Sequence, residues 1–194
     1  MIRELVLVSA DLTATPWFAS GTAPRPELPA GLSLTEAADA AAFPPEPVAP
    51  DLARARLAEG DRCITTQDAS GKIVGQMWLA QKPRRLDWIG CDVTPAADSV
   101  LLYNAWVEPA QRGRGVHWAM ASRACEIAIG MGLAKISAGL DRHEFQPFAH
   151  KYAEMGLAVI VPTASLWCMP STGWNVTLKP PRLLVDLSKG LTCA

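Results

Sequence analysis

The sequence has no long apolar run, and neither sign of charge is in excess. None of its apolar runs approaches the roughly 20 residues that a membrane-spanning helix needs. The apolar stretch near the start is short and has Glu4 inside it, which makes a poor secretory signal, so a buried β-strand is predicted there. Eighteen basic residues against nineteen acidic ones argue against the strong positive field of a dedicated duplex-DNA binder. We therefore expect neither a membrane nor a nucleic acid as partner.

Cysteine and histidine are few and scattered. The five cysteines are an odd number without CxxC spacing, and only three histidines accompany them. A zinc site is therefore not expected, and no other metal is predicted. The pattern indicates a reduced, cytoplasmic protein whose cysteines are mostly small core residues, namely Cys63, Cys91, Cys125, Cys168 and Cys193.

The overall composition is that of a globular protein. Apolar residues make up 49% and charged residues 19% of 194 residues, which is enough for one domain with a substantial core. Half of the sixteen prolines fall within the first fifty residues, where they exclude helix interiors and central strands. We predict a single domain over residues 1–194, with a proline-rich N-terminal portion (about 1–50) that packs on it or covers it. This portion is either a linker or a loop that lies over a site.

Periodicity predicts an α+β domain around a mixed sheet. The segment between Pro83 and Ser99 is expected to be irregular, and the pair Arg84-Arg85 within it is expected to be solvated. Residues 32–43 are compatible with the start of a strand or with a short helix. Helices are predicted over 51–59, 116–131 and 146–155, and strands over 61–67, 72–81, 99–107, 135–140, 157–169, 173–179 and 182–188.

The residues that predict a ligand-binding site lie in one loop. The strand that ends near Pro109 is followed by a stretch rich in arginine and glycine, and then by the long helix. The first amides of a helix lack partners and carry partial positive charge, glycine lets the backbone approach a ligand, and arginine adds charge. Together they predict a phosphate site, most naturally for pyrophosphate. The loop is not a P-loop, and counted from Gly113 its sixth residue, Trp118, fails the Rossmann pattern.

The residues Val107-Glu-Pro109, followed by Arg112-Gly-Arg-Gly-Val-His117, resemble the acyl-CoA binding motif of the GNAT (GCN5-related N-acetyltransferase) superfamily. That motif reads [RQ]xxGx[GA] after a strand ending in V-x-P, and His117 stands where glycine or alanine is usual. Downstream, Tyr152-Ala-Glu-Met-Gly-Leu157 resembles a second block of the family, and Phe145 stands where the family usually has asparagine. The resemblance covers roughly residues 61–160.

The resemblance implies a GNAT-like fold, α+β with a mixed, mostly antiparallel central sheet whose strands splay apart and are flanked by helices. It implies acetyl-CoA or another acyl-CoA as co-substrate and transfer of the acyl group to an amine. The pantetheine would lie along the strand end, the pyrophosphate on the loop amides, and Tyr152 would protonate the coenzyme A thiolate. The residues implied in binding are Trp106, Val107, Glu108, Arg112, Gly113, Arg114, Gly115, Val116 and His117.

The acceptor and the general base are left open. The acceptor is a small-molecule amine or a protein amine, and the sequence does not decide whether the chain forms a homodimer. The departures at His117 and Phe145 suggest an alternative, a catalytically silent acyl-CoA or small-ligand binding module of the same fold. A nucleotide-binding protein of another fold is a third reading. Candidates for the base are Glu108, His143 and Glu144, with a water relay in place of a single base as the other option. Asp87 and Asp92 either bind a cationic acceptor or are plain surface residues.

Overall fold

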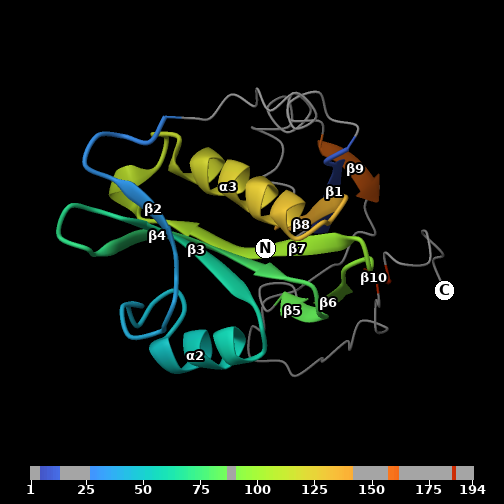
Figure 1. Ribbon diagram of the computed structural model, residues 1–194, viewed down its shortest axis with the longest axis horizontal. Coiled ribbons are helices and arrows are strands. Elements are labelled where there is room, and N and C mark those ends of the chain that lie inside the picture. Colours follow the sequence, from blue (N-terminus) through green and yellow to red (C-terminus); the bar gives the residue numbers. More distant parts are fainter. Residues whose placement is uncertain (1–4, 14–26, 87–90, 142–156, 162–184, 187–194) are drawn as a thin grey trace, which may run out of the picture.

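A computed structural model describes residues 5–13, 27–86, 91–141, 157–161 and 185–186 (Figure 1). A seven-stranded sheet in the order β2-β3-β4-β7-β8-β1-β9 and a three-stranded sheet in the order β10-β6-β5 form the frame. The large sheet comprises β1 (Leu5–Asp11), β2 (Ser33–Glu36), β3 (Arg62–Gln67), β4 (Ile73–Ala80), β7 (Ser99–Val107), β8 (Lys135–Asp141) and β9 (Leu157–Val161). The small sheet comprises β5 (Arg84–Leu86), β6 (Cys91–Thr94) and β10 (Val185–Asp186), and the helices are α2 (Pro50–Ala58), η1 (Pro109–Gln111) and α3 (Val116–Gly130).

The large sheet is antiparallel except between β7 and β8. These two strands pair in parallel only from Ser99 opposite Lys135 to Leu102 opposite Ala138. Beyond that point β7 continues along β4 and β8 continues along β1, so the two strands diverge. The α+β fold with splayed strands that the resemblance implied is therefore confirmed.

A bulge in β7 accompanies the divergence. The register between β4 and β7 shifts between Gln76 and Trp78, and Asn104 lies in this part of β7 with a left-handed φ of 46°. Asparagine is one of the few side chains that tolerate this conformation. Because a bulge bends its strand, it turns the end of β7 away from the line of β8.

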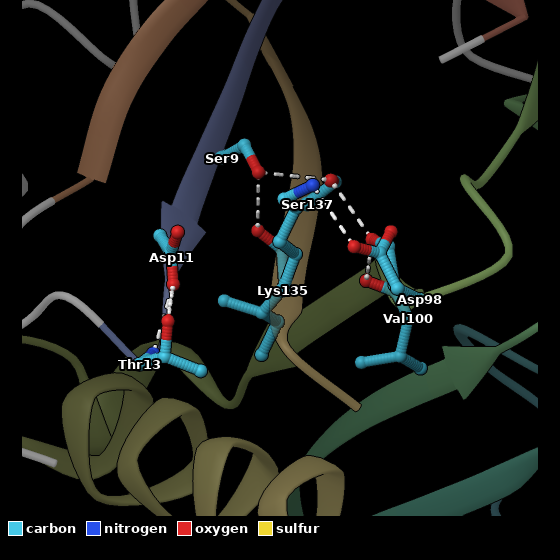
Figure 2. A network of polar contacts seen from close by, with 9 residues as sticks. Ser9, Asp11, Thr13, Asp98, Val100, Lys135 and Ser137 are labelled. Carbon is cyan, nitrogen blue, oxygen red and sulfur yellow. Dashed lines mark hydrogen bonds and ion pairs between the residues drawn. The ribbon is translucent and has the colours of Figure 1, made fainter. Parts of the chain in front are cut away.

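Side-chain hydrogen bonds connect β1, β8 and β7 at the end where β7 and β8 still pair (Figure 2). The Ser9 hydroxyl of β1 donates to the Ile136 carbonyl of β8 at 3.0 Å, and the Ser137 hydroxyl donates to that of Ser9 at 3.3 Å. Ser137 also shares a hydrogen bond of 3.2 Å with Ser99 of β7, and Lys135 pairs with Asp98 at 2.9 Å. These contacts stabilise the three strands relative to one another before β7 and β8 diverge.

The two helices cover opposite faces of the large sheet (Figure 1). Helix α3 lies close to β4, because a Cβ on Gly75 would be only 3.2 Å from Val116 and 3.4 Å from Met120. The predicted apolar stripe of α3 is buried as far as Ala128, whereas Met131 is exposed because the helix ends before it. We call the side of the sheet that each helix covers the α3 face and the α2 face. The apolar side chains buried on the α3 face are Ile64, Met77, Leu79, Val100, Val107, Met120, Ala124, Ile127 and Ile136. Those buried on the α2 face are Phe43, Val48, Ala53, Cys63, Trp78, Leu101 and Tyr103.

The N-terminal strand is confirmed, but its place in the sheet was not predicted. β1 lies between β8 and β9 and pairs with both in antiparallel fashion. The N–H of Leu12, just beyond β1, donates to the Ala134 carbonyl at 2.7 Å. Residues from the start of the chain are thus an integral part of the sheet that holds the diverging strands.

Most predicted elements that fall on described residues are found. The hairpin, helix α2, β7, α3 and β8 agree with prediction to within about two residues, and residues 33–36 are a strand rather than a helix. The prediction that residues 83–99 are irregular is wrong, because β5 and β6 form a small hairpin there. These strands are too short to show a period, and Pro83 and Pro95 flank them instead of interrupting them. The predicted helix over 146–155 and strand over 173–179 lie outside the described residues.

Within the described part of the chain, no helix has the length and apolar character needed to cross a membrane. The same residues contain no group of three or more histidine, cysteine, aspartate or glutamate side chains arranged to hold a metal ion.

Candidate functional site

The loop between β7 and α3 is built from glycines in left-handed conformations. Gly113 has a φ of 74° and Gly115, the N-cap of α3, has a φ of 86°. Residues with a Cβ rarely adopt these angles, so glycine is required for this path of the chain. Among the described residues no side chain caps α3, and no acidic residue stands in its first turn. The positive end of a helix of 15 residues is therefore left without a compensating anion from its own sequence.

The last backbone amides of this loop and the first of α3 have no acceptor among the residues that the structure describes. Among the described residues, the N–H groups from Gly113 to His117 donate to no acceptor, and the first backbone bond into the helix comes from Ala119 to the Gly115 carbonyl at 3.0 Å. Unpaired amides in a row at a helix start form a cradle for an anion with several oxygens. The residues predicted to bind phosphate, Gly113, Arg114, Gly115, Val116 and His117, are contiguous, and their amides have no acceptor among the described residues.

The two arginines of the loop differ in what they do. Arg112 Nε donates to the Val107 carbonyl at 3.0 Å, which ties the loop to the end of β7. Arg114 is exposed, and its guanidinium donates to Gln111 Oε1 at 2.5 Å. Arg112 therefore positions the loop, whereas Arg114 places positive charge beside the free amides.

The described end of the proline-rich N-terminal portion borders this loop. A Cβ on Gly115 would lie 3.9 Å from the Glu27 carbonyl oxygen. From there the chain runs toward β2, and Leu32 packs against the cluster of apolar side chains under α3. Residue 27 thus stands beside the N-terminus of α3, where the candidate phosphate site is.

The edge of β7 that faces β8 opens beside the loop. Beyond Leu102 this edge has no strand partner among the described residues, while the other edge remains paired with β4 as far as Val107. An extended ligand can therefore add to the free edge near Trp106 as a further strand would. The open edge and the loop are consecutive in the chain, so one elongated ligand can reach both.

Glu108 is more constrained than the sequence suggested. Its N–H donates to the Val74 carbonyl at 2.8 Å, and its carbonyl accepts from Gln111 N at 2.8 Å. Its carboxylate pairs with Lys72 Nζ at 2.5 Å, an interaction that raises the pKa of the lysine. Glu108 therefore has partners for both its backbone groups and its side chain, which leaves Trp106 as the better candidate for the backbone contact.

His117 lies in the first turn of α3, with its ring edge-on to that of Trp118 at 5.5 Å between centroids. Desolvation of the imidazole lowers its pKa below the ordinary value of 6.5. The side chain is therefore neutral near pH 7 and adds no positive charge beside the candidate phosphate site.

The lowered pKa of His117 predicts how stability depends on pH. Below about pH 6.5 the unfolded chain takes up a proton at this residue, and the native state resists that uptake. The free energy of unfolding should therefore fall as the pH drops, and His117→Gln should remove this part of the fall. Urea unfolding at pH 8 and pH 5 measures it: the variant should gain stability relative to wild type at the lower pH. If the free energy of unfolding falls between pH 8 and pH 5 by the same amount in His117→Gln as in wild type, the lowered pKa of His117 is contradicted.

On the α2 face, an ionic cluster is buried that sequence reasoning missed. Asp61 is 4% exposed and accepts from Arg84 Nε at 2.7 Å and from Arg84 Nη2 at 2.5 Å. The Tyr103 hydroxyl also donates to this carboxylate. The expectation that Arg84 is solvated is thus wrong, because a carboxylate distant in sequence draws it inside, whereas Arg85 is half-exposed and pairs with Asp92.

Tyr103 is the one tyrosine among the described residues. Burial, together with the hydrogen bond to Asp61, raises the pKa of its phenol well above the ordinary value. Such a phenol is a poor proton donor to a thiolate, so Tyr103 is structural. Tyr152, the predicted proton donor, lies outside the described residues, as do Phe145, the candidate bases His143 and Glu144, and Asp87, a candidate for binding the acceptor.

Comparison with known proteins supports the fold through solved structures alone. No family model matches the sequence, and no curated protein is significantly similar to it. The chain is similar to a GCN5-related N-acetyltransferase from Sphaerobacter thermophilus, with 16% identity and a TM-score of 0.53 over 81% of this chain and 49% of that one. It is also similar to a tandem GNAT protein from the clavulanic acid biosynthesis pathway, with 15% identity and a TM-score of 0.54 over 81% and 50% of the two chains.

A third similar structure is the GCN5-related glucosamine N-acetyltransferase region of a fungal multi-domain GH3 β-N-acetylglucosaminidase, at 15% identity and a TM-score of 0.52 over 80% of this chain and 20% of that one. The chain thus spans about half the length of the first two structures. At these identities the likeness concerns the fold, and this chain has the GNAT fold.

Proposed function

We propose that this protein is an acyl-CoA-dependent N-acyltransferase that transfers acetyl from acetyl-CoA to an amine by direct attack. The observation that carries the proposal is the row of amides from Gly113 to His117, which have no acceptor in the described part of the chain, beside the edge of β7 that has no described strand partner. The amides suit the pyrophosphate of coenzyme A, and the open strand edge suits the amide groups of its pantetheine arm. The GNAT fold of the solved structures supports the same reading.

The reaction needs two proton transfers and one attack. The neutral amine attacks the thioester carbonyl, the C–N bond forms, the C–S bond breaks, and the sulfur leaves as a thiolate that takes up a proton. We assign that proton to the Tyr152 hydroxyl, because Tyr103 is held by Asp61. A phenol pKa of about 10 against a thiol pKa of about 8.5 makes the transfer slightly uphill in water, so the site must assist it. General acid catalysis of this kind contributes about 10²–10⁴-fold.

The amine must also lose its proton before it attacks. Glu108 is the acidic residue at the end of β7, but Lys72 holds its carboxylate in an ion pair. Because this carboxylate is already engaged by Lys72, we assign deprotonation to water that enters between the diverging strands. The acceptor would be a small-molecule amine or a protein amine, and the protein would work in the cytoplasm.

Calorimetric titration with acetyl-CoA tests the proposal, with ATP and NAD as controls. Saturable binding of acetyl-CoA that is tighter than binding of either control is expected. Tighter binding of ATP or NAD would replace the proposal with a nucleotide-binding function. Bound acetyl-CoA that no amine ever deacylates would instead indicate a silent acyl-CoA binding module, and loss of turnover in Tyr152→Phe would exclude that module.

A further inference from the structure

Gln76 is a buried polar side chain without a partner. It is 0% exposed, and neither its Nε2 nor its Oε1 has a hydrogen-bond partner among the described residues. The indole Nε1 of Trp78, two residues along the same strand, is in the same condition. A buried donor or acceptor without a partner is destabilising, and such groups are rare in native proteins. Two such side chains on one strand point to a polar ligand that supplies their missing hydrogen bonds.

These groups lie on the face of the sheet opposite α3. Side chains alternate along a strand, and Gly75 faces Val116 and Met120 of α3, so Gln76 faces the other way. In the register, Gln76 is opposite Trp106, in the stretch of β7 that β8 has already left. Adjacent strands are about 4.8 Å apart, so the amide stands one strand away from the open edge.

Arg56 reaches the same face from α2. It is 8% exposed, and its guanidinium carbon lies 5.2 Å from the ring centre of Trp78 and 5.0 Å from that of Tyr103. With the Asn104 amide oxygen turned toward it, Arg56 donates at 2.9 and 3.1 Å to this left-handed residue of the bulge. Among the described residues, Arg56 has no carboxylate partner.

The buried charges on this face do not balance. Asp61 is the buried carboxylate, and Arg84 and Tyr103 already donate hydrogen bonds to it. Glu59 reaches Arg84 at 2.8 Å from the exposed rim, with 58% of its side chain in solvent. One buried cation, Arg56, is thus left with an amide oxygen and two aromatic rings, and an anion brought to this face would neutralise it.

We propose that the acceptor is an amine that carries a carboxylate, as an α-amino acid does, and that Arg56 and Gln76 bind it. The carboxylate would accept from the Arg56 guanidinium and from Gln76 Nε2, and Gln76 Oε1 would accept from the N–H of the amine. Positions 76 and 78 are about 7 Å apart along the strand, a span that a small amino acid covers. The inference rests on the proposed acyltransferase function and names its substrate class.

A matched panel of acceptors tests the substrate class. Each of several α-amino acids is compared with its amide and with its decarboxylated amine, and the release of coenzyme A thiol from acetyl-CoA is measured. The amino acids should have at least about 10-fold higher kcat/KM than their decarboxylated partners. Equal turnover of the decarboxylated amines, or no turnover of any amino acid by protein that binds acetyl-CoA, would overturn the inference while leaving acyl-CoA binding intact. Failure to bind acetyl-CoA would instead overturn the proposed function.

Gln76→Met supplies a readout that does not depend on turnover. Without ligand, Tm should rise by about 2–4 °C because an unpartnered amide is removed, and kcat/KM for amino acids should fall at least about 10-fold. The affinity for acetyl-CoA should not change. A structural amide would show the opposite, a lower Tm, and that result would overturn the role of Gln76.

Thr66→Val is the matched control. The Thr66 hydroxyl is also buried without a partner, but Thr66 is opposite Gly75 and therefore lies on the α3 face. This variant should raise Tm without changing the turnover of any acceptor. Arg56→Lys keeps the charge but loses the planar guanidinium, and it should reduce the preference for amino acids over decarboxylated amines. An undiminished preference would remove Arg56 from the site.

Discussion

Gly115→Glu is expected to raise the Kd for acetyl-CoA by roughly 100-fold, about 2.7 kcal/mol, as measured by calorimetry. Three effects act together. The new carboxylate stands at the positive end of α3 and repels the pyrophosphate, the side chain occupies the loop where the ligand would lie, and a φ of 86° is unfavourable for a residue with a Cβ. Each effect acts on the amides from Gly113 to His117, which have no other acceptor among the described residues.

Gly132→Glu is the matched control. Gly132 follows the other end of α3, has a φ of 74°, and has open space around the position of a Cβ. The control therefore adds the same charge and a similar backbone strain, about 1–2 kcal/mol, away from the candidate site. Its affinity for acetyl-CoA should match that of wild type. Folded Gly115→Glu protein with wild-type affinity would show that acetyl-CoA binds elsewhere.

Asp61→Ala is expected to lower the free energy of unfolding by about 3–5 kcal/mol, because it removes the buried partner of Arg84 and leaves this guanidinium with the exposed Glu59 alone. Arg84, whose side chain is 15% exposed, would lose both of its bonds to the carboxylate, and the buried Tyr103 hydroxyl would lose its acceptor. Urea unfolding at pH 7 measures the effect.

Asp51→Ala is the control for this prediction. Asp51 also pairs with an arginine, Arg54, at 2.7 Å, but 95% of its side chain is in solvent. An exposed pair contributes about 0–1 kcal/mol, so the control should change stability little. Equal losses in the two variants would show that the Asp61 cluster is not a buried network. The double variant of Asp61→Ala with Tyr103→Phe should lose less than the sum of the two single losses, because both remove the same hydrogen bond.

The hairpin of β3 and β4 shows what local sequence is sufficient to predict. Its two strands are separated by the turn around Asp68, whose Oδ1 accepts from Ser70 N at 2.9 Å and from Lys72 N at 3.1 Å. All groups that define this turn lie within five consecutive residues. The same holds for the loop before α3, where glycines, arginines and a helix start are neighbours in the chain. Both were therefore predictable from residue types and spacing.

The position of β1 shows what such reasoning cannot reach. An apolar run near the N-terminus predicts a strand but carries no information about its neighbours. Ser9 and Ile136, which share a hydrogen bond across β1 and β8, are 127 positions apart. The choice of β8 and β9 as partners depends on how the whole sheet closes around its apolar faces, which no short segment specifies.

The charged residues on the α2 face also depend on contacts between distant segments, which short stretches of sequence do not predict. Arg84 was expected in solvent, yet Asp61, 23 positions away, holds it inside. Arg56 and Gln76 carry no sequence signal at all, because a charged helix residue and a polar strand residue are ordinary on a surface. The sequence by itself determined the hairpin, helices α2 and α3 and the glycine-rich loop before α3, since backbone conformation depends on adjacent residues. Only the tertiary structure decided which polar groups are buried and which remain without a partner, because burial depends on distant segments that meet in the fold.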